Sequence, residues 1–250
     1  MFARTGRTAA LAGLIGCTAA LTLSGCYVDI GQPQHRTNTY SISPPVRTLV
    51  VNDQVGDVNV TGGTGRVSVT ERISYRHKVP HTTHAVRAGT LTLNSNCPVK
   101  QTCSVEYHVR VPPDITVRVN DSVGNIRLAT LTGPVTAHTN AGGIDLRSLS
   151  GTVHVADHAG SINGSRVSSA TATLSTNVGS IDVAFSAAPA TLVATVSVGS
   201  ITLRLPRRVS YAVHASTTVG STHVTVPQAS SSAHIITAHT RTGSVTVRPA

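Results

Sequence analysis

The chain has 250 residues, a formal net charge of +10 and only 3% aromatic residues. Its ten acidic residues include two glutamates, Glu71 and Glu106. This length allows one or two domains. The scarcity of aromatic side chains argues against a nucleic-acid-binding protein, which interleaves them with basic residues. Together with the few acidic residues, it also argues against a sugar-processing enzyme.

Residues 1–25 have the pattern of a bacterial lipoprotein signal. Arg4 and Arg7 give a basic start, and an apolar run follows that is too short to span a bilayer comfortably. Leu-Ser-Gly-Cys at positions 23–26 resembles the lipobox, whose cysteine receives a diacylglycerol and becomes the new N-terminus. We therefore predict lipidation of Cys26, which would anchor an exported protein on the outer face of the bacterial cell membrane. The alternative is an ordinary secretory signal with an incidental cysteine.

Residues 26–46 are predicted to form a flexible tether between the lipid and the fold. They contain Pro33, Pro44 and Pro45 and many polar residues, without sustained alternation. The predicted organisation is therefore a signal peptide (1–25), a tether (26–46) and one folded domain (47–250).

Residues 51–60 and 119–128 share one sequence frame, V-N-D-x-V-G-x-x-x-x, which places Gly56 in register with Gly124. Residues 70–113 interrupt the repeat with strand-like alternation, and we predict that they cap the first edge of a stack of coils. Cys97 and Cys103 lie inside this excursion. Outside the cytoplasm, so close a pair predicts a disulfide.

Residues 114–250 carry a repeat marked by seven glycines that are 18 to 23 residues apart. Most copies place aliphatic residues two and four positions after the glycine with a polar residue between them, which is typical of a strand with one buried face. Further glycines half-way between these divide each unit into two strands. We predict an all-β fold, a β-solenoid (β-helix-like) of about seven two-strand coils, with the last copy (240–247) at its end. An antiparallel sandwich is the alternative. The expected core ladder is Ile126, Ile144, Ile162, Ile181 and Ile201.

The lipobox, the repeat and the segment C-S-V-x-Y-x-V-x-V-P-P at 103–113 together resemble a known bacterial family. These are lipoproteins built from β-strand repeats and regarded as candidate adhesins, a family of unknown function. The similarity covers roughly residues 47–250. It implies an exported, surface-attached, non-enzymatic protein, and it carries no catalytic residues over to this chain.

The outward column of the repeat contains Arg127, Asp145, Asn163 and Asp182. Asp145 and Asp182 would be two coils apart, roughly 10 Å, while the carboxyl pair of an inverting glycosidase is about 6.5–9.5 Å apart. A carbohydrate-active β-helix enzyme using these two aspartates is therefore the alternative function. Because the chain lacks aromatic platforms for sugars, we instead predict a solvated polar ladder and no enzymatic activity.

His77, His81 and His84 cluster on the excursion, but no carboxylate ligand accompanies them. We therefore predict no metal and no cofactor. The positive charge could attract anionic wall polymers or acidic polysaccharide, or could simply aid solubility. The principal hypothesis is a non-catalytic binding or adhesin-like protein at the cell surface. Its expected partners are the membrane, through the lipid on Cys26, and a wall polymer or polysaccharide. An envelope-stress signalling component is a third hypothesis.

Overall fold

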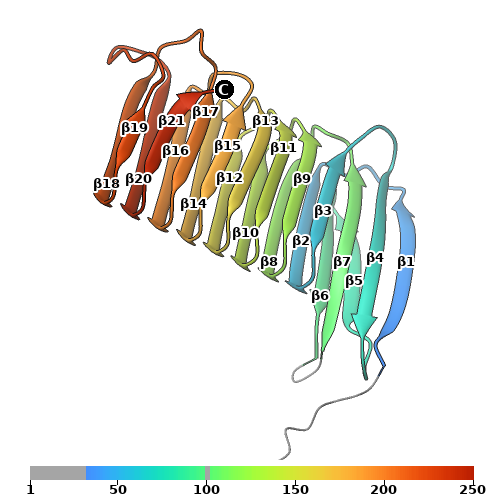
Figure 1. Cartoon of the computed structure of the whole chain (residues 1–250). Helices are drawn as coiled ribbons and strands as arrows, with labels where there is room; N and C mark the ends of the chain where they lie inside the picture. The colour runs from blue at the N-terminus through green and yellow to red at the C-terminus, as the bar shows by residue number, and fades with distance from the viewer. Residues whose placement is uncertain (1–31, 99–101) are drawn as a thin grey trace, which may run out of the picture. The chain divides into compact units, whose positions relative to one another are not determined.

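The structure is a computed structural model that describes residues 32–98 and 102–250. The predicted signal peptide and Cys26 lie outside these residues. Residues 32–250 form one compact unit. The described part contains only β-strands, arranged in two sheets of eleven and ten strands (Figure 1). It includes no apolar helix of membrane-spanning length.

We call the eleven-stranded sheet "sheet A" and the ten-stranded sheet "sheet B". In spatial order, sheet A consists of β1 (Gln34–Ile42), β4 (Val67–Tyr75), β7 (Cys103–Val111), β3 (Val58–Gly62), β9 (Ile126–Leu131), β11 (Ile144–Leu149), β13 (Ile162–Val167), β15 (Ile181–Phe185), β17 (Ile201–Leu205), β21 (Val245–Pro249) and β19 (Thr222–Val224). Sheet B consists of β18 (Ala212–Val219), β20 (Ile235–Thr242), β16 (Thr191–Val198), β14 (Thr171–Val178), β12 (Val153–Ala159), β10 (Val135–Ala141), β8 (Thr116–Val123), β2 (Thr48–Val55), β6 (Thr90–Asn96) and β5 (His81–Arg87).

The chain alternates between the sheets from β8 to β17. Each sheet B strand bends at a glycine into a sheet A strand, and we call such a pair a coil. Like strands of successive coils pair in parallel and in register, for example β10 with β8 and β12. The fold is therefore all-β and β-solenoid-like, and not an antiparallel sandwich.

A column of isoleucines runs through the core that the two sheets share. Ile126, Ile144, Ile162, Ile181 and Ile201 pair one with the next across β9 to β17. Each of these side chains is fully buried. Burying one such side chain stabilises the fold by roughly 1.5–3 kcal/mol, so each coil is held chiefly by the coils above and below it.

Part of the predicted tether is structured. Residues 34–42 form β1, which pairs antiparallel with β4 in nine residue pairs. The prediction of a flexible tether over 26–46 is therefore wrong for these residues. The strand pattern is faint in the sequence because only Tyr40 and Ile42 are apolar residues on its core-facing side.

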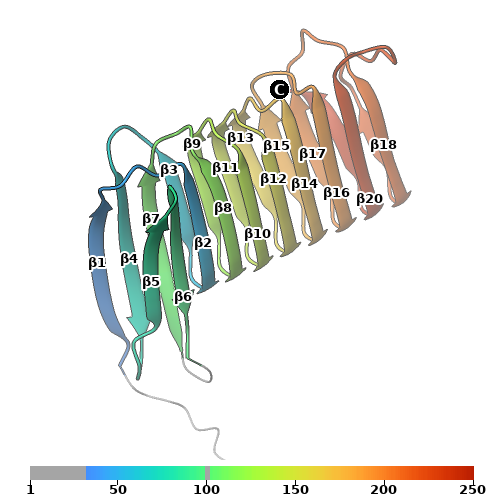
Figure 2. The same ribbon diagram turned by 180° about the vertical axis from the view of Figure 1, so that it is seen from behind.

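The excursion at 70–113 lies at one end of both sheets (Figure 2). Its strands β6 and β7 pair in parallel with β2 and β3, and so continue the stack. Beyond them, β5 and β4 pair antiparallel with β6 and β7. A disulfide joins Cys97, just after β6, to Cys103, the first residue of β7, with their Cα atoms 5.9 Å apart.

The opposite end of the stack departs from the order of the sequence. The coil of β20 and β21 lies between the coil of β16 and β17 and the coil of β18 and β19. The prediction that residues 240–247 end the stack is therefore wrong. The physical reason is that successive coils present equivalent edges, to which the last coil can pair in register on either side. The connection at 225–234 joins β19 to β20 and so allows the last coil to lie between the two earlier ones.

Candidate functional site

A groove of about 630 Å³ with both polar and apolar lining residues crosses the outer face of sheet A. Strands β3, β9, β11, β13 and β15 each contribute outward-facing residues to it. The four residues of the predicted outward column, Arg127, Asp145, Asn163 and Asp182, all line this groove. The rest of the lining is Asn59, Thr61, Leu128, Ala129, Leu146, Arg147, Gly164 and Ser165.

Backbone bends border the groove. Thr130, Ser148 and Arg166 have φ values of 57°, 52° and 53°, in the left-handed region that side chains usually avoid. Each bend interrupts the alternation of its strand just beyond the groove residues. The pairing of β13 with β15 shifts between Gly164 and Val167. The groove therefore lies beside the bends of three neighbouring strands, β9, β11 and β13.

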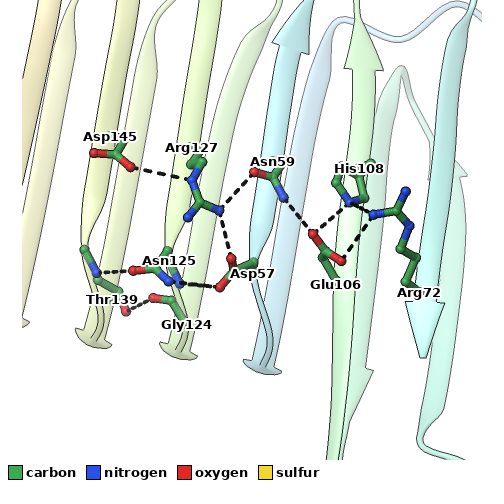
Figure 3. Close-up of polar contacts among 11 residues, drawn as sticks. Asp57, Asn59, Arg72, Glu106, His108, Gly124, Asn125, Arg127, Thr139 and Asp145 are labelled. Carbon is green, nitrogen blue, oxygen red and sulfur yellow. Dashed lines mark hydrogen bonds and ion pairs between the residues drawn. The ribbon is translucent and has the colours of Figure 1, made fainter. Parts of the chain in front are cut away.

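Arg127 is the centre of the polar network (Figure 3). Its Nη1 donates to Asp57 Oδ2 at 2.8 Å and to Asn59 Oδ1 at 3.4 Å. Its Nε lies 3.6 Å from Asp145 Oδ2. One guanidinium thus links side chains of β9 and β11 with Asp57, just before β3, and Asn59 on that strand.

Both aspartates of the enzyme hypothesis have cationic partners. Asp145 lies beside Arg127 and accepts a hydrogen bond from Asn163 Nδ2 at 3.3 Å. Asp182 accepts a hydrogen bond from Arg204 Nη2 at 2.7 Å and pairs with Nη1 of the same arginine at 2.6 Å. Because Asn163 pairs in register with both aspartates, they stand two strands apart.

The charges in this network reinforce one another. Burial acts to raise the pKa of Asp57, but hydrogen bonds from the Asn125 backbone, Arg127 and the Asn125 side chain outweigh it and lower the pKa. The hydrogen bond to Asp57 raises the pKa of Arg127. This pair is therefore a fixed ion pair at neutral pH.

A second polar cluster adjoins the groove on β4 and β7 (Figure 3). Glu106 lies 2.8 Å from His108 and 3.6 Å from Arg72, and Asn59 donates to it at 3.5 Å. Asn59 therefore connects this cluster to Arg127. The sequence repeat gave no signal for this cluster, because β4 and β7 lie in the excursion.

The structure places two of the three histidines of the excursion in different surroundings. His84 stacks on Tyr40 with ring centroids 4.3 Å apart, and His81 is exposed on the edge strand β5. Among residues 32–98 and 102–250, no three His, Cys, Asp or Glu side chains are grouped to hold a metal ion.

A column of buried polar residues lies inside the fold, three positions before the glycine in most coils, with Val196 taking this place before Gly199. The sequence repeat did not reveal it. Burial raises the pKa of Asp53 to about 6 and that of Asp121 to about 7, and it also raises the pKa of Asp157. The buried polar members are Asp53, Asp121, Thr139, Asp157, Thr176 and Thr240.

Comparison with protein families identifies the family to which this chain belongs. The family model described as Toastrack DUF4097 matches residues 45–248. The chain belongs to the Toastrack DUF4097 family. No functionally curated protein matches this Toastrack chain.

Solved structures similar to this Toastrack chain come from several bacteria. One, named as a candidate adhesin of Bacteroides fragilis, is 16% identical, covers 87% of this chain and 97% of its own, and has a TM-score of 0.45. A candidate cell adhesion protein of Clostridium sporogenes is 14% identical, covers 87% of this chain and 100% of its own, with a TM-score of 0.36. A candidate lipid binding protein of Parabacteroides distasonis is 12% identical, covers 88% and 98%, with a TM-score of 0.32.

Proposed function

We propose that the protein is a non-catalytic binding protein of the cell surface, and that its sheet A groove binds a polysaccharide of low net charge. The observation that carries the proposal is the groove lining, which includes two arginines, two aspartates, two asparagines and two hydroxyl side chains. Such a surface offers both donors and acceptors to sugar hydroxyl groups. Its balanced charge favours a weakly charged polymer over a strongly anionic one.

The spacing of the groove suits a polymer. Asn59, Arg127, Asp145, Asn163 and Asp182 stand at paired positions on five successive strands. Strands are about 4.8 Å apart, so a chain lying across them meets a new polar side chain at each step. A ligand made of repeating units can therefore satisfy several of these residues in the same way.

The enzyme alternative finds less support in the geometry. An inverting glycosidase needs one carboxyl group as an acid and the other as a base. Asp145 and Asp182 each face an arginine, so nothing in their surroundings separates them into an acid and a base. Envelope-stress signalling has no specific observation in its favour.

The proposal includes a lipid anchor on Cys26 and an exported, surface location. Because β1 begins at Gln34, the tether shortens to residues 26–33. Fully extended, these eight residues reach roughly 26–29 Å. The fold would then sit close to the membrane. We also propose that the antiparallel strands β1, β4 and β5 cap the end of the stack that lies next to the tether.

The test is binding of residues 27–250 to insoluble wall polysaccharide, with soluble reducing ends measured in the same samples. We expect Asn163→Ala to weaken binding at least several-fold. The matched control is Asn177→Ala, because Asn177 is an exposed asparagine on sheet B. Equal binding by both variants would contradict the groove assignment. Release of sugar that Asp182→Asn abolishes would contradict the non-catalytic assignment.

A further inference from the structure

The coil of β18 and β19 forms an open end of the stack (Figure 1). Within the part of the chain that the structure describes, β18 is the edge strand of sheet B and β19 is the edge strand of sheet A. Each pairs on one side only, with β20 and β21 respectively. The connection at 225–234 pairs with Tyr211, just before β18, through residues 227–229. Beyond that point, the other side of each strand presents its backbone groups for pairing.

The core is incompletely covered at this end. Val213, Ala215 and Thr217 are only partly buried, although they face the same way as core residues of the next coil. Their partners on β20, namely Ile236, Ala238 and Thr240, are fully buried. Val224 on β19 is likewise partly buried beside the fully buried Val247. One more strand against each edge would close the core.

This edge carries none of the usual protection against pairing. Residues 212–224 contain no Lys, Arg, Asp, Glu or Pro. Natural proteins commonly place charges or proline on an edge strand to prevent association. At the opposite end of the stack, the edge strands β1 and β5 carry Arg36 and Arg87.

We propose that this end binds a second copy of the same chain across a two-fold axis, so that β18 pairs antiparallel with β18 of the second copy. An axis passing through both sheets also brings the two β19 strands together. This axis keeps the core of each copy between the same two sheets. Sheet A and sheet B therefore both continue from one copy into the next. Contact with the opposite end of another copy would instead place Arg36 and Arg87 against this uncharged edge and would form open-ended filaments.

The test is the mass of residues 27–250 by sedimentation over a range of concentrations. We expect a dimer that Ala215→Asp converts to a monomer, because the carboxylate would be buried at the joined core. Ser216→Glu, on the outward face of β18, is the second variant. It should also weaken the dimer, and it provides the test if Ala215→Asp does not fold. Thr83→Asp on β5 is the control and should remain a dimer. A monomer at all concentrations, a dimer that Ser216→Glu leaves intact, or one that Thr83→Asp disrupts, would overturn the proposal.

A separate observation concerns the buried polar column. Thr176 Oγ1 donates to the carbonyl oxygen of Gly160 at 3.1 Å, and Thr240 Oγ1 donates to that of Gly199 at 2.9 Å. Each threonine thus bonds to the glycine of a neighbouring coil. Aspartates take the same place in the column in other coils, and Asp121 Oδ2 and Asp157 Oδ2 are buried without a hydrogen-bond partner.

Each unpartnered oxygen lies close to a backbone carbonyl oxygen. Asp157 Oδ2 and the carbonyl oxygen of Gly142 lie 2.5 Å and 1.4 Å from the point where a Cβ on Gly160 would stand. Asp121 Oδ2 and the carbonyl oxygen of Gly56 approach Gly124 in the same way, at 2.8 Å and 1.6 Å. Two acceptors facing each other in the core repel unless one of them carries a proton.

We infer that Asp121 and Asp157 are neutral carboxylic acids in the fold, each donating its Oδ2 proton to a glycine carbonyl oxygen as the threonines do. Burial and the nearby Asp53 and Asp57 raise the pKa of Asp121 to about 7. Burial also raises the pKa of Asp157, although backbone hydrogen bonds from Ala159 and His158, and the charges of His138 and His158, act in the opposite direction.

The sign of the pH effect follows from these raised values. The stabilisation of the fold by each protonated aspartate is fully present below the ordinary aspartate pKa of about 4. It is lost as the pH rises through the pKa of that aspartate in the folded state. For Asp121 that window runs from about 4 to about 7. Within the window, each such group lowers the folding equilibrium constant about tenfold per pH unit.

The test is the unfolding equilibrium of residues 27–250 between pH 4 and pH 9. We expect stability to fall with rising pH, and the double variant Asp121→Thr with Asp157→Thr to flatten this slope, because threonine keeps the bond without a titrating proton. Asp145→Thr, in the exposed groove, is the control and should leave the slope unchanged. An unchanged slope in the folded double variant would overturn the inference. The carboxyl infrared band gives an independent readout: no protonated carboxyl signal at pH 5 would also overturn it.

Discussion

The carbonyl oxygen of Gly160 lies 1.8 Å from the point that a Cβ atom on Gly179 would occupy. The carbonyl oxygen of Gly179 approaches Gly199 in the same way, at 1.7 Å. Successive coils therefore touch backbone to backbone at their bends. The strand spacing of the stack leaves no room for a side chain there.

Replacing Gly179 with alanine should destabilise the fold strongly. The new Cβ would collide with the Gly160 backbone, and the φ of 144° is one that alanine rarely adopts. We expect a loss of about 3 kcal/mol or more in the free energy of unfolding, measured by urea titration. Gly65→Ala is the control, because Gly65 has a φ of 106° but nothing within 4 Å of a new Cβ. Equal losses would show that backbone strain, and not the close approach, sets the requirement.

Shortening one isoleucine of the core column should leave a cavity between two neighbouring coils. Ile162 is fully buried between Ile144 and Ile181. We expect Ile162→Ala to lower the free energy of unfolding by about 2–5 kcal/mol. Val178→Ala should change it by less than about 0.5 kcal/mol, since Val178 is 55% exposed. Similar effects of the two variants in thermal or urea unfolding would contradict this view of the core.

The ion pairs of the groove should contribute little to stability. The side chains of Arg127 and Asp57 are 47% and 29% exposed, and exposed pairs of this kind are worth about 0–1 kcal/mol. Arg127→Ala should therefore unfold at nearly the same urea concentration as the unmodified chain. Because the pKa of Asp57 is lowered, its contribution is present at neutral pH and lost on acidification below its ordinary value. A large loss of stability in Arg127→Ala would make this variant unsuitable for binding experiments.

The proposed lipid anchor predicts where the protein is found in fractionated cells. Cys26→Ser should move the full-length chain from the membrane fraction to the soluble exported fraction, because no thiol remains at the lipobox to receive the diacylglycerol. Cys17→Ser should leave the distribution unchanged, since Cys17 lies within residues 1–25, the predicted signal peptide. Membrane retention of Cys26→Ser would place the anchor elsewhere.

Much of the fold follows from the periodicity of the sequence. The glycine register placed Ile144 beside Ile162 and Asp145 beside Asn163, as the structure does. The shared frame at 51–60 and 119–128 placed Val58 beside Ile126. The spacing of the glycines and the alternation of aliphatic and polar residues suffice to predict these positions, because in-register coils repeat the same surroundings.

The remaining features depend on contacts that periodicity does not encode. Residues 34–42 gain their order from β4, not from their own pattern. Thr176 and Asp157 point inward because they occupy core positions, although their side chains are polar. The order of the coils at the far end depends on which of several equivalent edges the last coil contacts, and the sequence repeat is the same for each.

The insertion of β20 and β21 between two earlier coils affects how the chain reaches its final form. Strands β18 and β19 have no parallel neighbour in the described chain until residues 235–250 have been synthesised. A polypeptide that ended before residue 235 would lose its last coil and also the support of the coil before it. Completion of the stack must therefore await the synthesis of residues 235–250, which supply both β20 and β21.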